Sequence, residues 1–368
     1  MSGIHQFVPM LHAGDAVGQH ALGLQELMEA RGVPSDIFVE LEDPETADRT
    51  RLVEAFDGVA HPDDVLVYQF ATASDLAARL AYRSERLVVN YHNVTPPEHF
   101  APWDNELARH QVRARDELSA LAGRAVLGVA VSEWNRSDLV EAGFASTAVV
   151  PPIVAGVVGG VGVVGGVGPP SAAGAVGATS ARATEGGARW LAVGRLAPNK
   201  ALEDAIASLL AYRMRWDPAA ELTVVGKPAV LSYASALRSY ADELGLGRAV
   251  HWAGPVGDVE LAAAYDTADV LVVTSEHEGF CLPAVEAMAR GLPVVAYSEG
   301  ALPEVVGDGG VLLSSKDPVT FSDAVHRLLS DRSWRERVRA AGRARIGALE
   351  LDTAGPRLVD LLLGVRDG

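Results

Sequence analysis

Residues 270–289, VLVVTSEHEGFCLPAVEAMA, decide the fold because they join a short apolar strand, a glycine turn and the start of a helix. The apolar run 270–273 is typical of a strand buried on both faces. A turn is expected at Gly279. Pro283 is expected where the helix begins, since the first helical residues need no N–H partner. Such strand–turn–helix units build a parallel, doubly wound sheet.

The same unit recurs in both halves of the chain, so the predicted fold class is α/β with two doubly wound parallel sheets. Strands are expected at 4–9, 37–39, 65–68, 87–89 and 126–131, and again at 190–193, 222–225, 250–252, 270–273 and 293–296. Helices are expected at 20–30, 75–82, 103–121 and 133–142, and again at 201–214, 231–244, 259–266 and 283–290.

The 368 residues are enough for two domains of similar size. We predict an N-terminal Rossmann-like domain at 1–152 and a C-terminal one at 188–350, with a C-terminal helix at 351–368 that can return to the first domain. Residues 153–187 are rich in Gly, Val and Ala and are interpreted as a flexible linker. Within it, Gly160 to Gly165 fits a dinucleotide-binding pattern by letter, but no strand or helix flanks it, and we reject that reading.

Charge and cysteine content exclude several classes of function. The net charge is −17, of which −12 falls in residues 1–150, and such a surface repels nucleic acids and anionic bilayers. With Cys281 as the single cysteine, no internal disulfide can form, and with no recognisable signal segment we expect a cytoplasmic protein. Only three lysines, Lys200, Lys227 and Lys316, accompany 28 arginines, so each lysine is a candidate functional residue.

Two glutamates in the opening segment are candidates for binding one extended ligand. Glu278 lies in the loop and Glu286 about one turn into the helix, eight residues further on. Carboxylates at these two positions can accept hydrogen bonds from different hydroxyl groups of the ligand. The N–H groups at the start of the helix form a seat for an anion.

A second segment, GRLAPNK at 194–200, leaves a strand through a glycine and carries two cations. Arg195 offers a planar fork of donors and Lys200 a point charge, a combination suited to a diphosphate.

These segments, together with GALPEVVGDGGVLL at 300–313, resemble the retaining family 4 glycosyltransferases of GT-B fold. The resemblance implies two Rossmann-like domains facing a cleft. It further implies that Glu286 binds the ribose of a nucleotide, Glu278 the donor sugar, and Arg195 with Lys200 the diphosphate. Backbone groups of the next loop residues would line the sugar and phosphate site, namely Gly279, Phe280, Cys281 and Leu282.

The first half agrees with the resemblance less specifically. Gly14 and Gly18 match the family's first glycine loop near the donor, although the usual adjacent glycine pair is absent. His92 stands where the family places a histidine beside the transferred sugar. The alternative is a structural histidine that only closes a strand. His12 and His20 are interpreted as surface or acceptor-side groups.

The implied activity is transfer of a hexose-type unit from a nucleoside-diphosphate sugar to an acceptor hydroxyl, with retention of the anomeric configuration. The catalytic candidates are His92, Glu278, Arg195 and Lys200. No metal or other cofactor is expected, since no metal-ligand pattern occurs in the sequence. The acceptor would be an oligosaccharide, a glycan or a natural product. Two alternatives stay open: a sugar-nucleotide epimerase of the same fold, and a non-catalytic partner protein.

Overall fold

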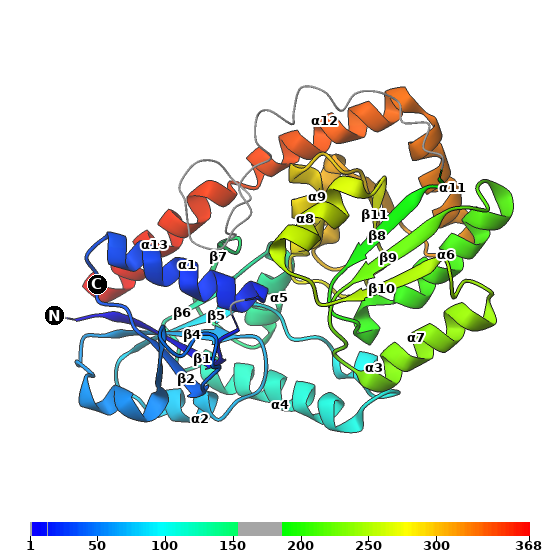
Figure 1. The fold of residues 1–368 in the computed structure, drawn as a ribbon. Coiled ribbons are helices and arrows are strands. Elements are labelled where there is room, and N and C mark those ends of the chain that lie inside the picture. Colours follow the sequence, from blue (N-terminus) through cyan, green and yellow to red (C-terminus); the bar gives the residue numbers. More distant parts are fainter. Residues whose placement is uncertain (1, 13, 154–185) are drawn as a thin grey trace. The chain divides into compact units, whose positions relative to one another are not determined.

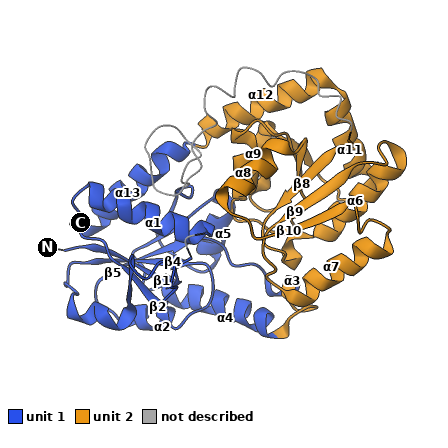
Figure 2. Ribbon diagram, viewed as in Figure 1, with its two compact units in different colours: residues 1–98, 106–164, 350–368 blue, residues 99–105, 165–349 orange. Residues whose placement is uncertain are grey.

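The computed structural model describes residues 2–12, 14–153 and 186–368, which form two compact units (Figures 1 and 2). Unit 1 comprises the described residues of 1–98, 106–164 and 350–368, and unit 2 those of 99–105 and 165–349. The linker expected at 153–187 and the pattern at Gly160 lie outside the described residues, apart from the two ends of the linker.

Unit 1 contains a sheet of seven parallel strands in the order β3-β2-β1-β4-β5-β6-β7. The strands are β1 (Ile4–Met10), β2 (Ile37–Leu41), β3 (Thr50–Leu52), β4 (Val65–Phe70), β5 (Arg86–Tyr91), β6 (Leu127–Ala130) and β7 (Thr147–Val149). The helices are α1 (Ala16–Ala30), η1 (Val53–Gly58), α2 (Leu76–Ala81), α4 (Asn105–Ala122), α5 (Glu133–Glu141) and α13 (Leu351–Asp367), while α3 (Pro97–Phe100) spans the boundary with unit 2.

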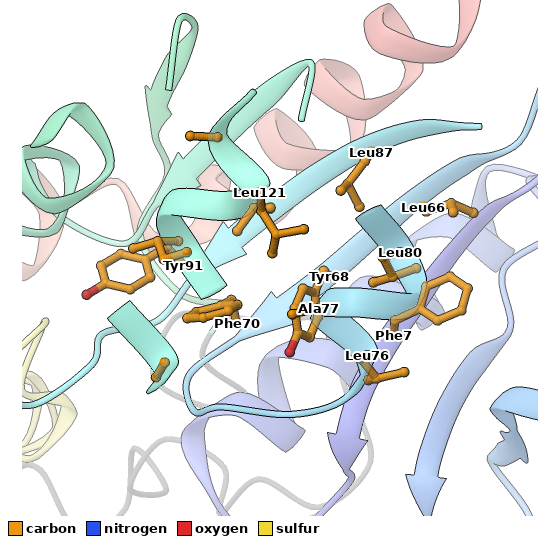
Figure 3. Packing of buried hydrophobic residues seen from close by; sticks show 14 of the residues in the cluster. Phe7, Leu66, Tyr68, Phe70, Leu76, Ala77, Leu80, Leu87, Tyr91 and Leu121 are labelled. Atoms are coloured by element: carbon orange, nitrogen blue, oxygen red, sulfur yellow. The ribbon is translucent and has the colours of Figure 1, made fainter. Parts of the chain in front are cut away.

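Alternate residues of β4 divide the core of unit 1 into two layers. Leu66, Tyr68 and Phe70 pack in one buried cluster with α2 and α4, as Figure 3 shows. Val65 and Val67 belong to the cluster on the opposite face. Both faces of the strand are therefore covered, as a doubly wound sheet requires.

The C-terminal helix α13 packs in unit 1, beside α1 (Figure 1). Leu358 and Leu362 are fully buried in the same cluster as Leu24 of α1. The helices approach closely at Gly355, where a Cβ atom would lie 2.4 Å from Leu27 Cδ1. A glycine at this point therefore allows the contact.

Unit 2 contains six parallel strands in the order β10-β9-β8-β11-β12-β13. The strands are β8 (Arg189–Val193), β9 (Glu221–Val225), β10 (Val250–Gly254), β11 (Val270–Val273), β12 (Val294–Tyr297) and β13 (Val311–Leu313). The helices are η2 (Pro198–Lys200), α6 (Leu202–Arg215), α7 (Leu231–Glu243), α8 (Asp258–Thr267), α9 (Leu282–Ala289), α10 (Leu302–Val306), η3 (Gly307–Gly309), α11 (Pro318–Ser330) and α12 (Arg332–Ala348).

The predicted fold class is confirmed, since both sheets are parallel and both have the central order 3-2-1-4 of Rossmann-type folds. Three short edge strands, β3, β7 and β13, were not predicted. The first helix begins at Ala16, four residues before the expected start, because Asp15 accepts a hydrogen bond from the N–H of Gly18 (2.8 Å) and caps it. Among the described residues, no helix is both long and apolar enough to cross a bilayer.

Candidate functional site

The candidate site of unit 2 lies at the carboxyl edge of its sheet, where two neighbouring strands end. Strands β8 and β11 pair in parallel, with Trp190 opposite Val270. Their carboxyl ends lead into the loops 194–201 and 274–281, which must therefore meet at one edge. This is the edge where doubly wound sheets bind ligands.

Hydrogen bonds tie the two loops together. Thr274 Oγ1 donates to the carbonyl of Ala201 (2.9 Å), and the N–H of Glu276 donates to the carbonyl of Asn199 (2.8 Å). The side-chain amide of Asn199 donates in turn to the carbonyl of His277 (3.0 Å). The loop that carries Glu278 is thus held against the turn that carries Lys200.

Lys200 and Glu278 meet directly. Lys200 Nζ lies 2.6 Å from Glu278 Oε1, which also accepts a hydrogen bond from Ser275 Oγ (2.8 Å). The Glu278 side chain is 9% exposed and that of Lys200 21%. Both residues line a small pocket with Gly194 and Arg195, and the Arg195 side chain is exposed. A hydrogen-bonding carboxylate and two cations thus border one pocket.

The start of α9 adds backbone donors near this pocket. Cys281 precedes the helix with φ 68°, in the left-handed region that non-glycine residues adopt at a cost. Pro283 follows in the first turn, as predicted. Helix starts leave N–H groups without intrahelical partners, so those at the α9 terminus can bind an anion. Burial raises the pKa of the Cys281 thiol, which argues against a nucleophilic role.

Gly300 packs closely against the backbone of the loop that carries Glu278. Its φ is 63°, and a Cβ atom there would lie 2.8 Å from the backbone nitrogen of Glu278. The neighbouring N–H of Ala301 donates to the Glu278 carbonyl (3.0 Å). Any side chain at position 300 would therefore displace the backbone that carries Glu278.

Glu286 is not among the residues that line the pocket. Its Oε2 accepts a hydrogen bond from the hydroxyl of Tyr265 on α8 (2.6 Å). Burial raises the pKa of Glu286, with the Tyr265 hydrogen bond acting in the opposite direction. Neither Tyr265 nor Ser275 was predicted from the sequence. Ser275 could have been found, because it is the second residue after β11 and stands three residues before Glu278.

The remaining predicted site residues lie in unit 1. Gly14 is exposed, with open space around it. Gly18 is buried in the first turn of α1, where a Cβ atom would lie 1.7 Å from the carbonyl oxygen of His12. Close packing thus requires a glycine at position 18, whatever else this residue does.

His92 is half-buried and contacts a chain of buried polar side chains. Its Nε2 lies 2.6 Å from Gln69 Oε1, which also accepts from Asn90 Nδ2 (2.9 Å). The same Asn90 nitrogen lies 2.7 Å from His20 Nε2, and the rings of His20 and His92 meet edge to face. The expectation that His20 is a surface group is wrong. It is 1% exposed, because α1 begins early and turns position 20 inward.

We expect unit 1 to lose stability in mild acid through His20. Burial lowers the pKa of His20 from 6.5 to about 4. The His20 ring is therefore protonated at a lower pH in the folded state than in the unfolded state. This contribution is present above pH 6.5 and is lost as the pH falls from 6.5 towards 4. Between pH 7 and pH 5 the loss should be about 2 kcal/mol.

Urea unfolding at both pH values measures this loss. In a His20→Gln variant the difference between pH 7 and pH 5 should shrink by about that amount, whereas replacing the half-exposed His61 by Gln should leave it unchanged. Equal pH dependence in the wild type and the His20 variant would contradict the assignment.

Among the described residues, no three His, Cys, Asp or Glu side chains converge as a metal site would require.

Comparison with known families gives a match in unit 2. Residues 180–345 match the family model of glycosyl transferases, group 1. D-inositol 3-phosphate glycosyltransferase of Frankia alni is 38% identical over 163 residues, which are 42% of this chain and 40% of that protein. The enzyme of the same name from Thermobifida fusca is 44% identical over 108 residues, 29% of this chain and 25% of that protein. The chain thus matches less than half of the length of these relatives.

Solved structures resemble the chain over almost its whole length at low identity. Alr3699/HepE of Anabaena, in complex with UDP and glucose, superposes with a TM-score of 0.70 and 18% identity, covering 97% of this chain and 98% of that one. Sucrose-phosphate synthase from Thermosynechococcus elongatus gives 0.73 and 20%, covering 99% of both chains. The fold is GT-B.

Proposed function

We propose that this chain, whose residues 180–345 match the group 1 glycosyl transferases, moves a sugar from a nucleoside-diphosphate sugar to an acceptor hydroxyl with retention of configuration. The observation that carries the proposal is the pocket bordered by Arg195, Lys200 and Glu278 at the carboxyl edge of the unit 2 sheet. These are two cations for a diphosphate beside one carboxylate for sugar hydroxyls. Anabaena HepE, of the same fold, has been solved with UDP and glucose.

Breaking the bond between sugar and diphosphate leaves negative charge on the departing phosphate. The exposed Arg195 and the ammonium of Lys200 stabilise this charge, with the backbone N–H groups at the start of α9 (Phe280, Cys281 and Leu282) as further donors. Lys200 already pairs with Glu278, so the ammonium is held in place before the ligand arrives.

The remaining roles follow the resemblance. Glu286 binds the ribose, His92 lies beside the transferred sugar, and the Gly14–Gly18 loop of unit 1 approaches the donor phosphate and the acceptor. The acceptor hydroxyl attacks on the face that the diphosphate leaves, and the leaving phosphate takes its proton. Acceptors of low negative charge, such as oligosaccharides or natural products, suit the acidic first half.

The two glutamates should have separable effects. Glu286→Gln removes the charge from a ribose-binding carboxylate, so nucleoside diphosphate and sugar nucleotide should both bind about 1.5–3 kcal/mol more weakly. Glu278→Gln should leave the affinity for free nucleoside diphosphate nearly unchanged and lower donor turnover, because its sugar contacts exist only with a sugar present.

Titration calorimetry and initial rates on both variants test whether Glu278 and Glu286 have these separate roles, with the melting temperature as the control for folding. Indistinguishable profiles of the two variants, or normal turnover by the Glu278 variant, would refute it.

Turnover should persist in excess EDTA, because cationic side chains and helix N–H groups, rather than a metal ion, are assigned to the diphosphate. Rates measured after chelation, and again after adding Mg²⁺ or Mn²⁺, test this. A loss that only the metal restores would contradict it.

The proposal as a whole is tested by a thermal-shift screen of UDP-, GDP-, ADP- and dTDP-sugars. A donor at 100 times its dissociation constant should stabilise the protein by about 2.7 kcal/mol. A donor found in this way is then incubated without acceptor. Conversion into a new sugar isomer would indicate an epimerase instead, and binding without turnover across an acceptor panel would indicate a non-catalytic protein.

A further inference from the structure

Lys316, one of the three lysines of the chain, lies between β13 and α11, outside the pocket of Lys200. Its ammonium binds two carboxylates, Asp204 Oδ2 at 2.7 Å and Glu276 Oε1 at 2.5 Å. The same nitrogen lies 5.2 Å from the ring centroid of Tyr297 at the end of β12. The Lys316 side chain is only 17% exposed, so these contacts are partly shielded from water.

One of these carboxylates belongs to the loop that carries the candidate sugar-binding residue. Glu276 stands two residues before Glu278, and its N–H donates to the carbonyl of Asn199, next to Lys200. Its second carboxylate oxygen lies 3.5 Å from His99 Nδ1, in the segment 99–105 of unit 2. Glu276 therefore joins the loop before α11 and the segment 99–105 to the 274–281 loop, and Asp204 of α6 is linked to it through Lys316.

We propose that Lys316 is a positioning residue for the sugar site. Together with Asp204 and Glu276 it forms a clamp, named here the Lys316 clamp, which fixes the 274–281 loop so that Glu278 meets Lys200 and the donor sugar. This inference rests on the proposed function, because it assigns a role within the same site.

Charge explains why the clamp needs a cation. Asp204 and Glu276 are bound to the same nitrogen, so without it two neighbouring carboxylates, 29% and 43% exposed, lose the cation that they share. Their repulsion is relieved by moving Glu276, since Asp204 is fixed in the first turn of α6. Burial by itself would lower the pKa of Lys316, but the two carboxylates outweigh it and raise the pKa, which keeps the ammonium charged.

Three variants and one control test the clamp. Lys316→Met removes the charge and keeps most of the length, Lys316→Arg restores a cation, and Glu276→Gln keeps the size of the loop residue. The matched control is Arg189→Met, which breaks the ion pair with Asp269 at the amino end of β8, away from the site. Each variant is assayed for melting temperature, affinity for free nucleoside diphosphate, and kcat for donor turnover.

Lys316→Met should lower kcat about ten- to hundredfold and weaken the binding of nucleoside diphosphate by a smaller factor, because Glu278 moves with the loop whereas Arg195 lies outside it. Lys316→Arg should recover most of the rate. Arg189→Met should keep the wild-type kcat. A Lys316→Met rate equal to that of the control would overturn the clamp, as would a loss that arginine fails to rescue. Should Lys316→Met not fold, Glu276→Gln decides by the same criteria.

Hydrogen exchange separates failure of the clamp from failure of the proposed function. The amide of Glu276 should exchange about tenfold faster in Lys316→Met than in Arg189→Met, whether or not any donor is turned over. Faster exchange in a protein that binds no donor would support the clamp and refute the sugar transfer. Unchanged exchange would refute the clamp.

Discussion

Replacing Lys200 by methionine is expected to lower donor turnover about 10²–10³-fold, the range found when one preorganised donor to a developing negative charge is lost. The variant removes a cation from the diphosphate and also leaves Glu278, whose side chain is 9% exposed, without its ion-pair partner. Affinity for nucleoside diphosphate should fall as well, since the proposal assigns Lys200 to the diphosphate both before and during the reaction. Arg195→Ala should weaken the same affinity, because both cations are assigned to the diphosphate.

Lys227→Met provides the matched control. Lys227 is an exposed lysine of the same unit that does not line the pocket, so its loss should leave affinity and turnover unchanged. Unchanged affinity in both the Lys200 and the Arg195 variants would defeat the diphosphate assignment.

Gly226→Ala should destabilise unit 2 by about 4 kcal/mol. Gly226 follows β9 with φ 145°, and a Cβ atom there would lie 2.0 Å from the carbonyl oxygen of Gly194. Because the obstacle is backbone, neither strand end can yield without moving the other. The added methyl group would also displace the turn that leads to Arg195.

The control for this prediction is Gly245→Ala, at φ 72° with no atom near the added methyl group. Only the conformational penalty of about 1–2 kcal/mol is expected there. Urea unfolding of both variants gives the two values. A Gly226 variant no less stable than the Gly245 variant would contradict the prediction, because it would show that the chain at Gly226 and at Gly194 can separate without loss of stability.

Alternating apolar runs and helical stretches predicted the fold class, because buried parallel strands such as 65–68 and 270–273 are apolar without interruption. The edge strands β3, β7 and β13 escaped prediction because each has only three residues, most of them half-buried or exposed, which is too few to show a period. The start of α1 was missed because the cap at Asp15 was not recognised. This error placed His20 on the surface instead of in the core.

In the candidate site of unit 2, the residues that follow the carboxyl ends of strands could be predicted from the sequence. Lys200 and Glu278 follow paired strands, so topology alone brings them near each other. Contacts that reach the site from other elements had no local signal. Tyr265 on α8 and Lys316 before α11 meet Glu286 and Glu276 only through packing of the whole unit.

The most direct test of the central claim is time-resolved NMR of the anomeric proton during incubation with a donor identified by thermal shift and a panel of hydroxyl acceptors. Nucleoside diphosphate should be released in equal amount with a glycoside that keeps the anomeric configuration of the donor, and the glycoside signal should be lost in Lys200→Met. A product of inverted configuration would contradict the retaining mechanism. Absence of any glycoside, with the donor bound but unchanged, would contradict sugar transfer itself.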